Sequence, residues 1–381
     1  MGRFKHFFLA LVAVAGLLLG GCGDDNDTIV VLPYSGKFLY ANNDGAVNAV
    51  SGFAIRANGS LVELAGSPFV TGGGGSFSGF FAVNPIAMAR SKKLLFASNR
   101  LDSTVTVFDI NSVTGELTAI GAPVAAGGSM VESGSLAVDD GENFLFVAND
   151  DGNTDPLLNV SSISVFAIGA DGTLTPVVGS PFNLTGMGAD GITLNPVGDK
   201  LYVAAPTANA IAVLDVAADG TLTQIPGSPF AAYTGIGGIA SFVLASPTLG
   251  LSGSFGGFLA SYNIDSNGAP ILLDTLDLGG NSQALTTTRK GSLAVLSGGM
   301  TSQISVVQVT SDGNMSLANG SPFATAASTS GYALANPSGK YLYATEADQI
   351  EAFVIDSEGS LTTISTYPLT NPGYVRGLVI Y

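Results

Sequence analysis

Short apolar runs alternate with glycine-rich polar turns along most of this 381-residue chain. Runs such as "KFLYANN" (37–43) and "NFLFVAN" (143–149) have the length of single strands and are bounded by turn residues. Continuous apolar runs of this length are typical of strands that are buried on both faces. The chain also contains 51 Gly and 17 Pro, with only 11% charged residues, which disfavours long helices. The pattern predicts an all-β protein.

One strand pattern recurs seven times, and each copy contains a two-residue turn. The turns are Asn58-Gly59, Thr114-Gly115, Asp171-Gly172, Asp219-Gly220, Asn267-Gly268, Asp312-Gly313 and Glu358-Gly359, spaced 45 to 57 residues apart. Because Gly adopts positive φ at little cost, such turns favour tight antiparallel hairpins. Each unit then contains four strands, A to D, with the hairpin between C and D. Four-stranded units with this period predict a seven-bladed β-propeller.

The tetrapeptide "GSPF" follows the hairpin in four units, at 66–69, 179–182, 227–230 and 320–323, and "GAPV" takes its place at 121–124. Proline cannot donate a ladder hydrogen bond, so we expect it to close strand D at the outer edge of the blade. The fifth unit, around 247–257, lacks the Lys-aromatic run of the others. Its strand B is therefore predicted to be weaker.

The last nine residues, "GYVRGLVIY" (373–381), resemble an eighth strand A that is not followed by strands B, C and D. This segment can complete the first blade and close the ring. Residues 29–33, "IVVLP", compete for the same place, and the sequence leaves the choice between residues 29–33 and 374–381 open.

The N-terminus has the features of an export signal. Arg3 and Lys5 precede an apolar run from Phe7 to Leu19, which is too short to span a bilayer. Leu19-Gly20-Gly21-Cys22 resembles the bacterial lipobox, in which the cysteine is lipidated. We therefore expect a signal peptide at 1–21, a lipidated Cys22 with an acidic tether at 22–28, and one propeller domain at 29–381. The expected location is the bacterial cell envelope, at the periplasmic face or outer surface of the outer membrane.

Charge and residue counts exclude several functions. The formal net charge is −16 and no basic cluster is present, which argues against nucleic acid as a partner. Cys22 is the only cysteine and His6 the only histidine. The mature chain therefore has no Ser-His-Asp triad, histidine-based zinc site or thiol chemistry. We expect a monomer.

Variants of "LYVAN" after Pro-x-Gly-Lys, the "DGTL" turn and "GSPF" together resemble the lactonase-like seven-bladed propellers. That family includes 6-phosphogluconolactonase and carries the YVTN-type repeat. The resemblance covers residues 29–381 and implies a sugar-lactone hydrolase with its site at the mouth of the central channel. It also implies an Arg followed by His at the start of an innermost strand. Arg376 matches the Arg, but Gly377 stands where His is expected.

Polar residues of the B–C and D–A loops should converge at one end of the channel. The candidate ligand-binding residues are Arg376, Arg100, Asn42, Asp44, Asn99, Asn149, Asp190 and Glu346, with Asn43, Glu132, Asp150, Asn209, Gln283 and Asp348 in the same loops. For the Asn and Asp residues, the alternative is that they only shape turns. For Arg376, the alternative is a salt bridge between blades.

A calcium ion is the only cofactor that the sequence suggests. Asp151, Asn153 and Asp155 have the alternating spacing of a calcium-binding loop. However, Pro156 stands where an EF-hand has Gly, and Ser162 where it has Glu, so no EF-hand forms. The alternative is a long B–C loop without a metal.

Two functional hypotheses follow. In the first, a lipid-anchored propeller acts as a binding or scaffold protein for a protein, glycan or small-molecule ligand. In the alternative, it is a 6-phosphogluconolactonase-like hydrolase that replaces histidine by a carboxylate with Arg, or by a metal-bound water.

The lipidation hypothesis has a direct test. Replacing Cys22 by Ala removes the acylation site, and acyl chains contribute about 0.8 kcal/mol per buried CH₂ to membrane affinity. We expect Cys22→Ala to move the protein from the membrane fraction to the soluble fraction, as measured by fractionation and immunoblotting. An unchanged membrane fraction would contradict lipidation at Cys22.

Overall fold

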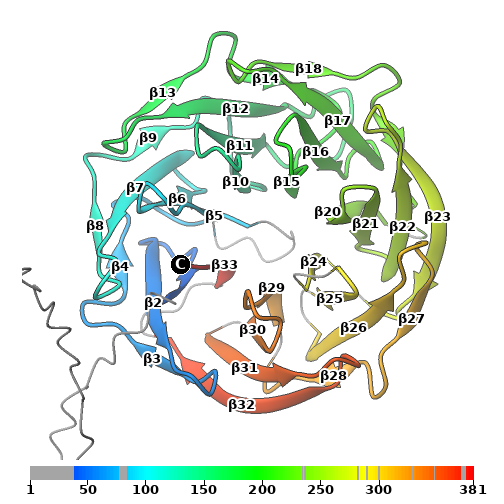
Figure 1. Ribbon diagram of the computed structural model, residues 1–381. Helices are drawn as coiled ribbons and strands as arrows, with labels where there is room; N and C mark the ends of the chain where they lie inside the picture. The colour runs from blue at the N-terminus through cyan, green and yellow to red at the C-terminus, as the bar shows by residue number, and fades with distance from the viewer. Residues whose placement is uncertain are drawn as a thin grey trace, which may run out of the picture. The chain divides into compact units, whose positions relative to one another are not determined.

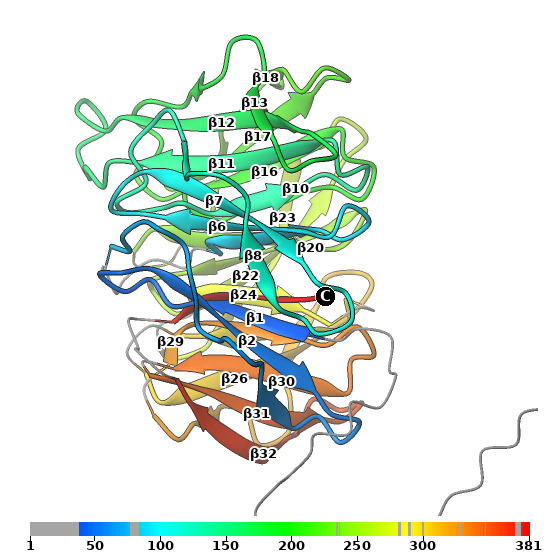
Figure 2. The same ribbon diagram turned by 90° about the vertical axis from the view of Figure 1, so that its left-hand side faces the viewer.

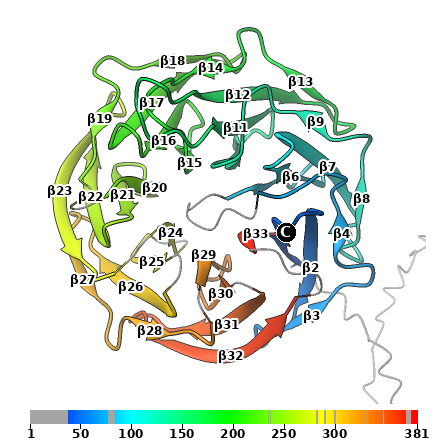
Figure 3. The same ribbon diagram turned by 180° about the vertical axis from the view of Figure 1, so that it is seen from behind.

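The computed structural model describes residues 38–76, 84–233, 235, 237–280, 283–288, 291–298, 301–327, 329–346, 348–369 and 375–381. The regular elements in these ranges are strands, arranged in seven antiparallel sheets. Figure 1 shows the sheets as blades around a central axis, and Figure 3 shows the same ring from behind. The prediction of a seven-bladed all-β propeller is confirmed. No helix able to cross a membrane is found in the described ranges.

Each blade presents a short strand A to the central axis (Figure 1). From blade one to blade seven these strands are β33 (Arg376–Ile380), β5 (Ile86–Ala89), β10 (Leu136–Val138), β15 (Ile192–Leu194), β20 (Ile239–Ser246), β24 (Ala284–Thr287) and β29 (Thr329–Ala335).

Strands B and C form the middle of each blade and carry most of its buried side chains. In blade order, the B strands are β1 (Phe38–Asn42), β6 (Leu94–Asn99), β11 (Phe144–Asp150), β16 (Lys200–Ala205), β21 (Leu249–Ser254), β25 (Leu293–Ser297) and β30 (Tyr341–Glu346). The C strands are β2 (Ala49–Ile55), β7 (Thr104–Ile110), β12 (Ser161–Ile168), β17 (Ala210–Val216), β22 (Phe258–Ile264), β26 (Gln303–Val309) and β31 (Gln349–Ile355).

The outer strand D has two forms. In five blades it consists of two pieces: β3 (Leu61–Glu63) and β4 (Phe69–Val70), β8 (Leu117–Ala119) and β9 (Val124–Ala125), β13 (Leu174–Pro176) and β14 (Phe182–Asn183), β18 (Leu222–Gln224) and β19 (Phe230–Ala231), and β27 (Met315–Leu317) and β28 (Phe323–Ala324). In blades five and seven it is one strand, β23 (Pro270–Asp277) or β32 (Leu361–Pro368).

The role predicted for "GSPF" needs correction, because the motif interrupts strand D rather than closing it. After the proline the chain resumes pairing with the same strand C: Phe69 lies opposite Val50, as Glu63 lies opposite Phe53. The serine before the proline fills the gap in the ladder. In blade four, the Ser228 hydroxyl accepts the Val213 N–H at 2.9 Å, and the other three "GSPF" serines accept an N–H of strand C in the same way. A side-chain oxygen thus replaces a backbone acceptor.

The C-terminal strand closes the ring. β33 pairs antiparallel with β1, placing Val379 opposite Tyr40 and Leu378 opposite Ala41. The last strand and the first therefore lie side by side at the inner edge of blade one. The prediction that the C-terminal segment completes the first blade is confirmed, while residues 29–33 lie outside the described residues.

Blade five differs from the expectation of a weak strand B. β21 is a six-residue strand, fully buried and paired on both sides. The aromatic bulk missing from its own sequence comes from neighbouring strands. A Cβ on Gly250 would lie 2.5 Å from the Phe242 ring, so the small residue makes room for that ring.

The hydrophobic core lies mainly in layers between adjacent blades. One such layer joins Tyr40 and Phe69 of blade one to Leu95 and Phe108 of blade two. Figure 2 shows these sheets stacked around the ring. Tyrosines fasten neighbouring blades: the Tyr40 hydroxyl donates to the Gly115 carbonyl, and the Tyr343 hydroxyl of blade seven donates to Gly59 of blade one. Ring closure thus depends on side-chain contacts as well as on β33.

A substitution of Leu378 tests how much the closing strand β33 contributes to the free energy of unfolding. Leu378 is 1% exposed and packs in the layer between blades seven and one. We expect Leu378→Ala to lower the free energy of unfolding by about 2–5 kcal/mol, as is usual for a buried leucine, measured by urea denaturation. Val379→Ala is the matched control, because its side chain is only partly buried. Equal losses in the two variants would contradict this assignment.

Candidate functional site

Charged residues of blades one to four converge where the B–C and D–A loops surround one end of the channel, a region we call the mouth. Asp44 follows β1, Arg100 follows β6 and Arg376 begins β33. Asp150 ends β11 and Asp190 precedes β15. All five side chains are at least 96% buried. The sequence predicted that polar residues of these loops meet, and for these five the structure brings them to one region.

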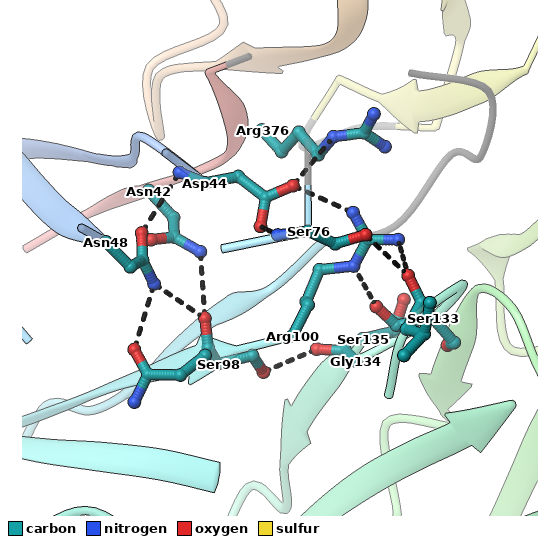
Figure 4. A network of polar contacts seen from close by, with 12 residues as sticks. Asn42, Asp44, Asn48, Ser76, Ser98, Arg100, Ser133, Gly134, Ser135 and Arg376 are labelled. Carbon is teal, nitrogen blue, oxygen red and sulfur yellow. Dashed lines mark hydrogen bonds and ion pairs between the residues drawn. The ribbon is translucent and has the colours of Figure 1, made fainter. Parts of the chain in front are cut away.

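Asp44 lies between the two arginines (Figure 4). Its Oδ2 atom is 2.8 Å from Nη1 of Arg100 and 3.2 Å from Nε of Arg376. Its other oxygen accepts the Ser76 N–H at 3.1 Å. The turn that holds this carboxylate is built locally, since Asp44 has a φ of +47° and donates its own N–H to Asn48. The predicted alternative for Arg376 is a salt bridge between blades, whereas its salt bridge with Asp44 lies within blade one and it is Arg100 that reaches this carboxylate from blade two.

Arg100 is held on its other side by backbone carbonyls of the loop before β10. Its Nε donates to the Ser133 carbonyl at 2.5 Å and its Nη2 donates to the Val131 carbonyl at 2.8 Å (Figure 4). The planar guanidinium suits such a fork of fixed acceptors. Sequence reasoning could not find these two acceptors, because every residue carries a carbonyl and none has a distinguishing signal.

Burial and charge change the proton affinity of Arg376. Burial and the neighbouring Arg100 lower the pKa of Arg376 to about 10, while Asp44 opposes the shift. Arg376 still carries a positive charge at neutral pH. The mouth therefore contains two buried cations around one carboxylate.

Asp190 is the least satisfied group of the mouth. Neither of its carboxyl oxygens has a hydrogen-bond partner among the described residues, although the side chain is 1% exposed. Burial, and then the charges of Asp150 and Glu132, raise the pKa of Asp190 well above its usual range, whereas Arg100 and Arg376 oppose the shift. A carboxyl group without protein partners in a buried site is available for a ligand or a proton transfer.

Asp150 has a different environment, although it lies near Asp190. It accepts hydrogen bonds from the N–H groups of Gly152 and Ala189 and from the side-chain amide of Asn159. Burial raises the pKa of Asp150, and these three hydrogen bonds oppose the shift. Asp150 is therefore a structural carboxylate that holds the loops of blades three and four together.

The proposed calcium loop is organised by Asn159. Its amide Nδ2 donates to Asp150, to Asp151 and to the Asn153 carbonyl, at 2.8, 3.3 and 3.0 Å. Asp151, Asn153 and Asp155 also accept N–H groups of the same loop. The described residues contain no group of three or more acidic, His or Cys side chains positioned to hold a metal ion. The calcium site remains a prediction.

Three predicted asparagines have structural contacts at the ends of their B strands. Asn99 donates to Thr104 and Thr106, and Asn149 donates to serines at the equivalent positions of blade three. Asn42 donates to the Ser98 carbonyl at 3.3 Å. These contacts agree with the alternative that the asparagines shape the loops.

Glu346, the remaining predicted site residue, is buried at the end of β30 in blade seven. It accepts a hydrogen bond from Gln349. Burial, followed by its contact with the Glu351 carboxyl group, raises the pKa of Glu346 to about 7, and the Gln349 hydrogen bond opposes the shift. Glu346 and Glu351 form a carboxyl pair of their own within blade seven.

The comparisons with known proteins agree with the architecture. The family described as Lactonase, 7-bladed beta-propeller, matches residues 26–133. The periplasmic gluconolactonase of Pseudomonas aeruginosa has 17% sequence identity and a TM-score of 0.70, with 90% of this chain and 98% of that chain covered. A Bacteroides fragilis protein provisionally assigned as a 6-phosphogluconolactonase has 15% identity and a TM-score of 0.70, over 94% and 100% of the two chains.

A Lactobacillus plantarum protein, at 15% identity and a TM-score of 0.68, has the same fold over 91% of this chain and 100% of that chain. A search of curated protein sequences finds no match. The resemblance to lactonase-like seven-bladed propellers is confirmed, and at these identities the solved structures establish the fold alone.

The environment of Asp190 predicts an unusual pH dependence. The raised pKa means that the folded protein keeps a proton at pH values where the unfolded chain has lost it. The stability that the protonated Asp190 carboxyl group contributes is therefore largest below about pH 3.8, the ordinary pKa of aspartate. This contribution is lost as the pH rises through the pKa of Asp190 in the folded protein. We expect Asp190→Asn to raise the free energy of unfolding at pH 8 by on the order of 1 kcal/mol. The difference should vanish near pH 4 in urea titrations.

Asp150→Asn is the matched control for this prediction. An amide offers one acceptor oxygen where the carboxylate has two, so the variant loses hydrogen bonds from its neighbours and is expected to be less stable at pH 8. A pH-independent effect of Asp190→Asn, or a loss of stability at pH 8, would show that Asp190 is not buried without partners.

Proposed function

We propose, starting from the resemblance to lactonase propellers, that this protein hydrolyses lactones at the mouth of its channel. The comparisons favour this alternative over the binding or scaffold hypothesis, because the named relatives are a gluconolactonase and a provisional 6-phosphogluconolactonase. The observation that carries the proposal is the Asp190 carboxyl group, which is buried without a hydrogen-bond partner among the described residues and lies near Arg100 and Arg376.

Asp190 would act as the general base. In lactone hydrolysis, water attacks the carbonyl carbon, the bond from that carbon to the ring oxygen breaks, and a hydroxy acid is released. A carboxylate whose pKa is raised is a stronger base than an ordinary aspartate, and after it has taken a proton from water it can give that proton to the leaving ring oxygen. This role needs no histidine, in agreement with the single histidine at position 6.

The arginines would stabilise the negative charge that develops on the carbonyl oxygen. Arg376 is the arginine to which the resemblance to lactonase propellers points, and its Nε lies 3.2 Å from Oδ2 of Asp44. Arg100 donates to the same carboxylate and to two backbone carbonyls. Because the side chains of both arginines are almost completely buried, a substrate reaches them only when the loops of the mouth move apart.

A location outside the cytoplasm belongs to the same proposal. The export signal and the lipobox-like Cys22 support an envelope protein attached to the membrane through its lipid. The name of the Pseudomonas relative, a periplasmic gluconolactonase, supports such a location.

Binding without turnover is the second candidate function. It is favoured by the extensive protein contacts of Arg100 and Asp44, which are both 0% exposed, since groups held in this way need not take part in chemistry. In this case the mouth would bind a sugar acid or lactone without hydrolysing it.

Lactone hydrolysis by the purified mature protein tests the proposal. We expect δ-gluconolactone or 6-phosphogluconolactone to be hydrolysed above the spontaneous rate, and Asp190→Asn to lower kcat by about 10²–10⁴-fold, the usual contribution of a general base. Arg376→Gln should also lower kcat, and its fold should persist because Asp44 keeps its contact with Arg100. Circular dichroism checks the fold, and reactions with and without divalent cations test a metal requirement.

Asp171→Asn is a suitable control, because Asp171 lies in an exposed hairpin turn of blade three. It should have wild-type activity. Absence of hydrolysis with both lactones, or full activity of Asp190→Asn, would contradict the proposed role.

A further inference from the structure

Large apolar side chains are exposed on the loops that form one arc of the mouth. Their members are Val47, Leu101, Val131, Leu157, Leu158 and Val160, and we call this set the apolar rim. Leu157 is 88% exposed and Leu158 is 62% exposed. Exposed apolar residues that gather beside a binding site usually mark a contact surface, whereas scattered ones need no explanation.

The apolar rim is confined to blades one to three. Its residues lie in the B–C loops of these blades and, for Val131, in the D–A loop before β10. Among the described residues of the mouth loops of blades four to seven, none is an exposed large hydrophobic. The apolar side chains thus occupy the arc that also supplies Asp44, Arg100 and Asp150.

The residues of the apolar rim lie close to the buried charged residues, either next to them in the sequence or through hydrogen bonds. Leu101 directly follows Arg100, and the Val131 carbonyl accepts a hydrogen bond from the Arg100 guanidinium. Val47 is three residues from Asp44. Leu157 and Leu158 belong to the loop that Asn159 ties to Asp150. A molecule whose polar end reaches the arginines would therefore have this rim beside the rest of its structure.

We propose, on the basis of the function proposed above, that the preferred substrate is a lactone with an alkyl or acyl tail. The ring would lie at Asp190 and Arg376, and the tail would lie along the apolar rim. A tail rich in hydroxyl groups would gain nothing from leucine and valine side chains, whereas a hydrocarbon tail gains affinity with each methylene removed from water.

Charges beside the rim favour a substrate tail over a lipid bilayer as its occupant. Asp102 follows Leu101 and Asp155 lies two residues before Leu157, and both are exposed. These carboxylates and the net charge of −16 would be repelled by anionic lipid headgroups. A single hydrocarbon tail fits between such groups, because it does not require the whole face to enter an apolar layer.

A chain-length series tests the inference. The rates of γ-butyrolactone, γ-octalactone and γ-dodecalactone hydrolysis are compared with that of δ-gluconolactone. We expect kcat/KM to rise by about twofold per methylene, less than the roughly fourfold expected for complete burial. The double variant Leu157→Ser/Leu158→Ser should flatten this rise. The control double variant Val113→Ser/Val197→Ser changes two exposed valines in a C–D hairpin and an A–B turn and should keep the full slope.

Each outcome has one meaning. If δ-gluconolactone is hydrolysed but kcat/KM does not depend on tail length, the tail inference is wrong and the proposed hydrolase function stands. If no lactone is hydrolysed, the proposed function fails and the inference fails with it. If the Leu157/Leu158 variant keeps the slope but loses binding of the unlipidated protein to phosphatidylcholine vesicles, the rim contacts membrane instead, and the tail inference is overturned.

Discussion

The pairing of β33 with β1 is the interaction on which the rest of this structure depends. It joins the C-terminal strand to the first described strand and so closes the seven blades into a ring. The same pairing brings Arg376, the first residue of β33, beside Asp44 at the end of β1. The pairing that closes the ring therefore also forms the Asp44–Arg376 contact at the mouth.

Charge burial at the mouth opposes stability. Two guanidinium groups and three aspartates are nearly excluded from water, and the contacts of Asp44 and Asp150 offset only part of the desolvation cost. Asp190 has no such compensation among the described residues. Burial of this carboxyl group therefore opposes stability, as is usual for groups with a catalytic role such as the one we propose for it. The exposed leucines of the apolar rim likewise contribute little to the stability of the fold.

The blades show how a repeat tolerates variation. Five interrupt the outer strand around a proline, and the four serine-containing copies return a side-chain oxygen to the ladder. Blades five and seven instead have continuous outer strands with a local shift in register. In both forms strand D stays paired with strand C on either side of the irregularity.

The sequence alone determined the number of blades, their hairpins and the candidate strand that closes the ring, because these depend on local rules of turn chemistry and strand length. The sequence also identified candidate ligand-binding residues at the mouth. It could not distinguish the roles of Asp44, Asp190, Asn99 and Glu346. Only the tertiary structure separated them, since the contacts of a loop residue depend on neighbouring blades distant in sequence. Asn99 binds its own strand C, Glu346 joins a carboxyl pair in blade seven, and Arg100 binds carbonyls that have no sequence signal. Among the described residues, neither carboxyl oxygen of Asp190 has a hydrogen-bond partner, which no feature of its local sequence indicates.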